Sequence, residues 1–86
     1  MNFKLIISSP EGTVFSGECE RISLRGSEGS LSVMAGHTPF VTSVAPCEPV
    51  IYFENGESRK GKCQGGLLTV DGDCVTLLSG TFKFSE

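Results

Sequence analysis

The chain has 86 residues and a formal net charge of −3 at pH 7, with 20% charged and 38% hydrophobic residues. This length is typical of one domain, expected here to span 1–86, and the hydrophobic share is too high for an acidic disordered tail. Acidic residues outnumber basic ones by 10 to 7, and the basic residues form no run, which argues against a nucleic-acid partner.

Apolar and polar residues alternate with a period of two from the N-terminus onward. In 2–8, for example, Phe3, Leu5 and Ile7 share one face. This period is typical of antiparallel strands with one solvated face. Strands are expected on this pattern at 2–8, 18–25, 30–34, 40–44, 49–54, 59–64, 67–70 and 74–78.

Turn-forming residues separate these segments, at 10–12, 26–29, 55–56 and 71–73. Asn-Gly and Asp-Gly supply the positive φ angles that tight hairpins need. A helix is not expected: the best candidate, 36–46, contains two prolines and several β-branched residues. Eight or nine short strands predict an all-β fold, an antiparallel β-sandwich or a small barrel.

The C-terminal residues 81–86 are expected to form a last edge strand, with Phe82 and Phe84 on the same side. If this segment is not paired, the two rings would form an exposed apolar patch that fits a partner.

The sequence predicts a soluble protein that is made and kept in the cytoplasm. No stretch approaches the roughly 18 apolar residues of a membrane span, and the apolar part of the N-terminus is too short for a secretory signal. The cysteines, Cys19, Cys47, Cys63 and Cys74, have wide gaps and no CxxC pair, which disfavours zinc. Reduced, buried thiols are the favoured interpretation, with a disulfide as the alternative.

Residues for catalysis or cofactor binding are scarce. His37 is the single histidine, no G-x-S-x-G motif is present, and the carboxylates are scattered. The glycine pairs at 26–29 and 65–66 are not followed by the Lys-Ser/Thr of a phosphate loop. No catalytic, cofactor or metal site is therefore expected, and the protein is expected to work by contact. A small enzyme or redox protein with a reactive cysteine is a weaker alternative.

Four blocks of the sequence carry a family resemblance. Residues 9–18 match the pattern S-P-x-G-x-V-F-x-G-E, and residues 26–40 are similar to G-x-E-G-x-L-G-V-L-P-G-H-x-P-L. Residues 64–70 are similar to S-G-G-F-x-E-V, and residues 75–78 to V-T-V-L-A. These patterns, in this order and spacing over about residues 1–80, resemble the epsilon subunit family of F-type ATP synthases.

The resemblance implies a ten-stranded β-sandwich at the foot of the rotating central stalk, bound to the gamma subunit and the membrane c-ring. Such a subunit binds no cofactor or small-molecule substrate and helps to couple proton translocation to ATP synthesis. It lies at the inner face of the bacterial cell membrane through the complex. The loop that matches the c-ring-facing segment is Ser27, Glu28, Gly29 and Ser30, and the segment that matches the gamma-facing one is Gly36, His37, Thr38 and Pro39.

The chain departs from the family pattern at several positions. Ser32 stands where the family has glycine, Ala35 replaces a proline, and Cys47 lies where a glycine is expected. Residues 79–82 replace the usual Ala-Asp and the alanine-rich lead into a two-helix C-terminal domain that can inhibit ATP hydrolysis. The chain ends at Glu86, so the expectation is a single sandwich domain without that helical domain.

These departures leave a second function open. In that interpretation the protein is a stand-alone β-sandwich binding module that is related to epsilon but has another protein partner.

Overall fold

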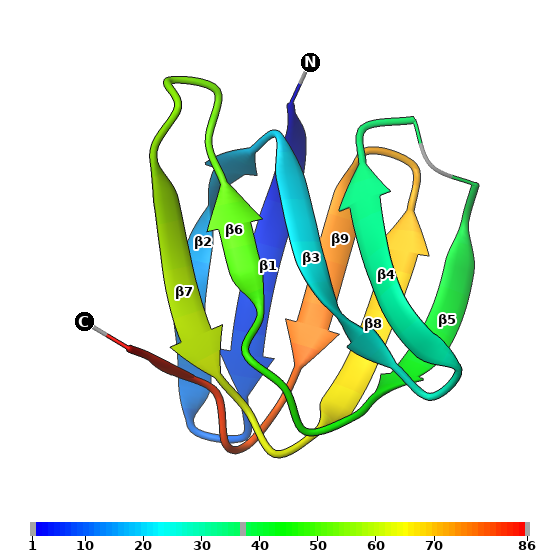
Figure 1. Ribbon diagram of the computed structural model, residues 1–86, viewed down its shortest axis with the longest axis vertical. Coiled ribbons are helices and arrows are strands. Elements are labelled where there is room, and N and C mark those ends of the chain that lie inside the picture. Colours follow the sequence, from blue (N-terminus) through cyan, green and yellow to red (C-terminus); the bar gives the residue numbers. More distant parts are fainter. Residues whose placement is uncertain (1, 37, 86) are drawn as a thin grey trace.

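The computed structural model describes residues 2–36 and 38–85. Over these residues the chain forms ten strands and no helix, so no helix is present that could cross a membrane (Figure 1). The predicted all-β fold of about ten short strands is confirmed. The strands are β1 (Phe3–Ser9), β2 (Gly12–Cys19), β3 (Arg21–Gly26), β4 (Gly29–Met34), β5 (Phe40–Val44), β6 (Val50–Tyr52), β7 (Ser58–Lys62), β8 (Gly66–Asp71), β9 (Cys74–Leu78) and β10 (Lys83–Phe84).

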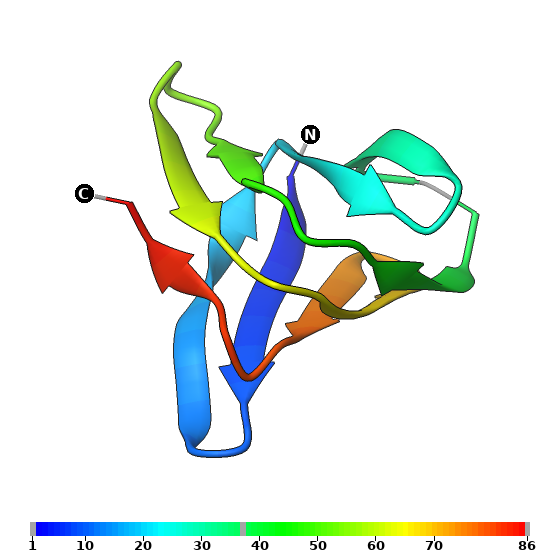
Figure 2. The ribbon, with the colours of Figure 1, turned by 60° about the horizontal axis from the view of Figure 1, so that its bottom comes forward.

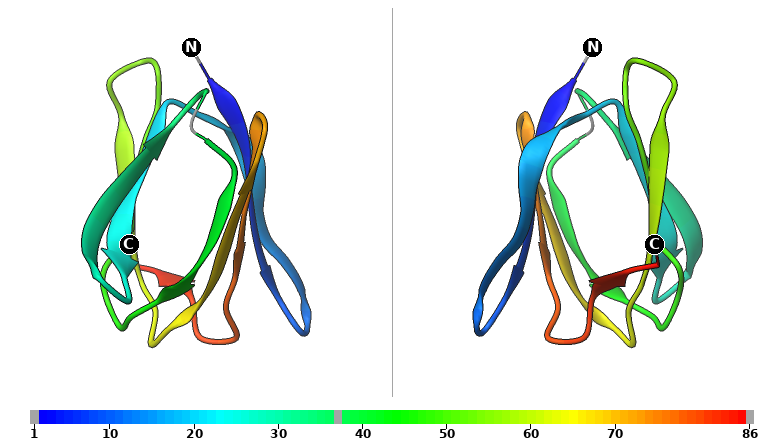
Figure 3. Two further views of the ribbon diagram at one scale, coloured as in Figure 1. Left: turned by 90° about the vertical axis from the view of Figure 1, so that its right-hand side faces the viewer. Right: turned by 90° about the vertical axis from the view of Figure 1, so that its left-hand side faces the viewer.

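The strands form two layers packed face to face (Figure 3). The first layer has the order β4-β3-β6-β7-β10, and the second has the order β5-β8-β9-β1-β2. The layers are continuous at one corner, where Gly26 of β3 pairs with Val44 of β5. The sandwich is therefore one hydrogen-bonded sheet folded onto itself.

Strand direction is antiparallel throughout these ladders except for one pair. β1 and β9 run parallel, with Leu5 opposite Val75 and Ile7 opposite Leu77. The period-two pattern shows which face of a strand is buried but not which strand lies beside it, so it could not identify this pair.

The strand predicted at 18–25 is wrong in its bounds. The chain leaves β2 at Cys19 and enters β3 at Arg21, and the exposed Glu20 between them donates its N–H to the Tyr52 carbonyl over 2.8 Å. β2 itself was missed because it is an edge strand on which most residues are exposed, so the alternation of Phe15 and Cys19 is weak.

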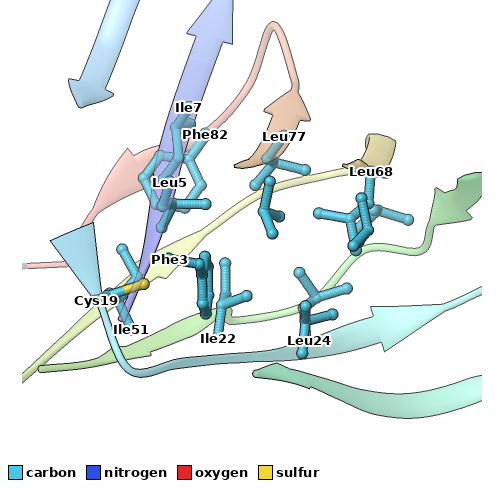
Figure 4. Close-up of a cluster of buried hydrophobic side chains, with 14 of the residues drawn as sticks. Phe3, Leu5, Ile7, Cys19, Ile22, Leu24, Ile51, Leu68, Leu77 and Phe82 are labelled. Atoms are coloured by element: carbon cyan, nitrogen blue, oxygen red, sulfur yellow. The ribbon is translucent and has the colours of Figure 1, made fainter. Parts of the chain in front are cut away.

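The core lies between the two layers. Leu5, Ile7, Leu68 and Leu77 from the second layer point toward Ile22, Leu24 and Ile51 from the first (Figure 4). All of these side chains are buried. They occupy alternate positions in their strands, so the period-two pattern identified most of the core.

The C-terminal segment crosses from the end of β9 to the edge of the first layer, where β10 pairs with β7 (Figure 2). Phe82 is buried, and its ring centroid lies 5.1 Å from that of the half-buried Phe84. The predicted edge strand is therefore confirmed for Lys83–Phe84 but not for the whole of 81–86, and the alternative of an unpaired, exposed patch is wrong.

All four cysteines are free thiols. Cys19 and Cys63 are buried, whereas Cys47 and Cys74 are half-buried. The favoured expectation of reduced thiols in or beside the core matches this arrangement.

Candidate partner-binding surface

The loop predicted to face a c-ring is the tight turn between β3 and β4. Gly26 pairs with Gly29 across this turn, which leaves Ser27 and Glu28 as its two loop residues. Ser27, Glu28, Gly29 and Ser30 are all exposed. Gly29 has φ +126°, in a region that favours glycine, and the Ser27 N–H donates to the Ser43 carbonyl over 3.1 Å. The turn therefore presents the Glu28 carboxylate to solvent on a fixed backbone.

The segment predicted to face a gamma subunit lies in the connection between β4 and β5. Gly36, with φ +82°, Thr38 and Pro39 are exposed. His37 lies outside the described residues, so its expected role is not addressed by the structure.

These two predicted contact segments lie at opposite ends of β4 (Figure 1). Residues 31–35 lie between them, and the six residues of β4 span about 20 Å. The structure therefore does not bring the two segments together into one site. Such a separation suits contact with two different partners.

A third surface, which the sequence reasoning missed, is the outer face of the second layer. Strand register aligns Ile6, Thr76, Thr69 and Val41 in one row and Ser8, Leu78, Leu67 and Ser43 in the next. Neither row contains a charged side chain. Val41 is 62% exposed, Leu78 46% and Leu67 39%. We call these eight residues the uncharged face.

The signal for this face was present in the sequence. The pairs Leu67-Leu68 and Leu77-Leu78 place an apolar side chain on both sides of their strands. Strands that are apolar on both faces are typical of sheets that are covered on both sides. The uncharged face also meets the predicted contact segments, because Val41 follows Pro39 closely in the chain. A shallow cleft lined by Glu28, Ser30 and Val41 continues it toward the β3–β4 turn.

Two departures from the family pattern have local structural roles. The Ser32 hydroxyl lies 2.9 Å from that of Ser23 on the neighbouring strand β3. The Ser79 hydroxyl is buried, donates to the Gly65 carbonyl over 2.8 Å and accepts the Thr81 N–H over 3.3 Å. These bonds hold the connection from β9 to β10, so Ser79 helps to bring the C-terminal segment across the sandwich.

The described part of the chain offers little for catalysis or metal binding. Across 2–36 and 38–85, no three residues of the types that bind metals lie together. Burial raises the pKa of the Cys19 thiol from 9.0 to about 11, and burial also raises the pKa of the Cys63 thiol. Both thiols therefore stay protonated at neutral pH, and a thiol is a far weaker nucleophile than a thiolate.

Comparison with known proteins matches this chain to one family in both the family model and the individual relatives. The family model described as the ATP synthase delta/epsilon chain β-sandwich domain matches residues 2–84. The ATP synthase epsilon chain of Clostridium perfringens is 34% identical over 84 residues, which are 98% of this chain and 63% of that protein. The sodium-ion-specific epsilon chain of Acetobacterium woodii is 33% identical over 84 residues, with the same coverage. This chain thus spans just under two thirds of the length of these relatives.

Solved structures show the same fold. A chain in the mitochondrial ATP synthase of Euglena gracilis superposes with a TM-score of 0.90 at 21% identity, over 96% of this chain and 53% of that one. A chain in the central stalk and c-ring structure of Tetrahymena thermophila ATP synthase superposes with a TM-score of 0.76 at 15% identity, over 93% and 64% of the two chains.

Proposed function

Because this chain belongs to the ATP synthase delta/epsilon β-sandwich family, we propose that it is a non-catalytic central-stalk subunit of an F-type ATP synthase. In this role it binds the gamma subunit and the c-ring and helps to couple ion translocation to ATP synthesis. The observation that carries the proposal is the match of the family model to residues 2–84.

The gamma subunit is the partner proposed for the uncharged face and the adjoining segment Gly36–Pro39. Burial of Val41, Leu67 and Leu78 would supply the apolar centre that such interfaces have. Gly36 permits close approach of a partner backbone, because glycine has no Cβ atom.

The c-ring is the partner proposed for the turn at Ser27–Ser30. Glu28 is exposed at the tip of this turn and can pair with basic groups on a ring loop. The complex would hold the protein at the inner face of the bacterial membrane. Protons are the expected coupling ion, and the name of the Acetobacterium woodii relative shows that the family also includes a sodium-specific member.

Co-purification with the gamma subunit of the same organism, in reducing buffer, tests the first contact. We expect a stable one-to-one complex, which Val41→Glu weakens by 10-fold or more, about 1.4 kcal/mol, because it places a charge in an apolar interface. Ser58→Glu, on the exposed part of β7 in the other layer, is the matched control and leaves binding unchanged. Failure of the folded wild-type protein to bind would contradict the proposal.

His37→Ala tests the residue that lies outside the described part of the chain. If the resemblance assigns it correctly to the gamma contact, affinity falls by an amount on the order of 1 kcal/mol. Unchanged affinity would remove His37 from this interface.

Glu28→Lys tests the c-ring contact. The variant is expected to fold normally, because Glu28 is exposed, and to lower ion pumping of the reconstituted enzyme. Glu11→Lys, on the exposed β1–β2 turn, is a control with the same charge change. Equal pumping by Glu28→Lys and wild type would count against the ring contact.

The departures at Ser32, Ala35 and Cys47 favour a second candidate, a related sandwich that binds another protein. A folded chain that fails to bind gamma but retains a defined partner in an unbiased pull-down would support this candidate over the first.

A further inference from the structure

Cys47 and Cys63 lie directly opposite each other where the β5–β6 connection meets the end of β7. They form an isolated antiparallel bridge in which each N–H donates to the other carbonyl over 3.0 Å. Two residues that exchange both hydrogen bonds have Cα atoms about 5.5 Å apart and side chains on the same side. This separation falls in the range of about 4.4–6.8 Å that a disulfide spans.

The two thiols differ in access. Cys63 is buried, whereas Cys47 is half-buried and lines an open cleft together with Arg25 and Ser32. Burial is the main cause that raises the pKa of Cys63, and a hydrogen bond with the Cys47 thiol and the charge of its thiolate add to the shift. Because Cys47 lines the open cleft and Cys63 is buried, a small molecule in solution reaches the Cys47 thiol first.

We propose that Cys47 and Cys63 are a redox-sensitive pair that a small-molecule disulfide oxidises to an intramolecular disulfide. The Cys47 thiolate attacks one sulfur of the reagent, which forms a mixed disulfide and releases one thiolate of the reagent. Cys63, after losing its proton, attacks the Cys47 sulfur and expels the second. The two cysteines together lose two electrons and two protons, and the reagent leaves as two thiols.

The modification would add a covalent link at a connection that main-chain hydrogen bonds hold, among them the bond from the Gly61 N–H to the Pro49 carbonyl over 2.9 Å. The connection between β5 and β6 is held to the end of β7 by the Cys47–Cys63 bridge, and the ion pair nearby, Glu48 with Lys60, is 3.9 Å long and exposed. Because Cys47 lines the same cleft as Ser30 and Ser32 of β4, the bond would form beside the β3–β4 hairpin. The reaction needs this chain alone and does not depend on the proposed rotor function.

The test uses the purified protein with Cys74→Ser, which removes the other half-buried thiol. After incubation with glutathione disulfide at pH 8, alkylation under denaturing conditions and peptide mass mapping identify the remaining thiols and any link. We expect the loss of two thiols, a peptide pair joined through Cys47 and Cys63, and complete reversal by dithiothreitol.

Variants of the pair separate its two steps. In Cys63→Ala, which keeps the attacking thiol, Cys47 is expected to stop at a mixed disulfide with glutathione. In Cys47→Ser, a change at a half-buried site, neither a link nor a mixed disulfide is expected at Cys63. Three retained thiols in the folded Cys74→Ser protein, a persistent mixed disulfide there, or a link that includes Cys19 would overturn the proposal.

Discussion

On one side of the sandwich main-chain hydrogen bonds join the two layers, whereas on the opposite side phenylalanine rings pack between the edge strands. On the first side, which we call the backbone seam, the Ala45 N–H donates to the Arg25 carbonyl over 2.9 Å beside the Gly26–Val44 pair. On the second, the aromatic seam, the rings of Phe15 and Phe84 bridge β2 and β10, with centroids 6.0 Å apart.

The aromatic seam is built from four rings contributed by distant parts of the chain. The Phe15 centroid also lies 6.3 Å from that of Phe53, and Phe84 contacts Phe82. The Arg59 guanidinium lies 3.7 Å from the centre of the Phe84 ring. The backbone seam depends on main-chain groups that every residue carries, but the aromatic seam depends on specific side chains. Substitutions should therefore have larger effects at the aromatic seam.

The largest effect is expected from Phe82→Ala. Removal of this buried ring leaves a cavity between the layers and should lower the free energy of unfolding by about 3–5 kcal/mol, measured by urea denaturation. Phe84→Ala is the matched control, and because its ring is half-buried its effect should be roughly half as large. Equal losses for the two variants would mean that Phe82 does not anchor this seam.

Glycines at the two seams allow the next comparison. A Cβ on Gly61 would overlap the Phe82 ring and lie 2.9 Å from the Lys83 carbonyl, so Gly61→Ala should destabilise the fold by about 1–3 kcal/mol. A Cβ on Gly26 would lie 2.7 Å from Leu31 Cδ2, the end of a flexible side chain. Gly26→Ala should therefore have the smaller effect in the same urea measurement, and the reverse order would contradict this account of the seams.

Ser79→Ala should destabilise the connection from β9 to β10, which leads into the aromatic seam. The variant leaves the Gly65 carbonyl and the Thr81 N–H without the Ser79 hydroxyl, and we expect a loss of about 1–2 kcal/mol. Ser32→Ala removes the exposed hydroxyl that contacts the Ser23 hydroxyl, and it should change the free energy of unfolding by less than about 0.5 kcal/mol. Thermal unfolding of the two variants side by side measures the difference, and indistinguishable melting curves would reject the role of Ser79.

The smallest effect on stability is expected from Cys19, which lies at the end of β2 on the same face of the strand as Phe15. Burial raises its pKa from 9.0 to about 11 in the folded state. Well below pH 9 the thiol is protonated in both the folded and the unfolded state, so the stability of the fold does not change with pH through this group. Above pH 9 the unfolded chain binds fewer protons than the folded one, and stability should fall by about 1 kcal/mol between pH 9 and 10. Cys19→Ala should show a shallower decline over this window. Identical slopes would show that Cys19 does not cause the alkaline loss.

The candidate contact surfaces were only partly predictable. The β3–β4 turn was found at residues 26–29 because glycine supplies a backbone conformation that other residues rarely adopt, and Gly29 has that conformation. The uncharged face was not found, although Leu67 and Leu78 signal it, because its rows exist only when four strands stand in register. Register is a property of pairs of strands and not of any one segment.

The sequence by itself determined most of the strand segments, most of the buried alternate positions and the family, because period-two patterning and short motifs are local. Only the tertiary structure decided that β1 lies parallel to β9, that Cys47 faces Cys63, and that Phe15 meets Phe84. Each of these contacts joins residues far apart in the chain. Their partners are selected by the packing of the whole core, which no single segment encodes.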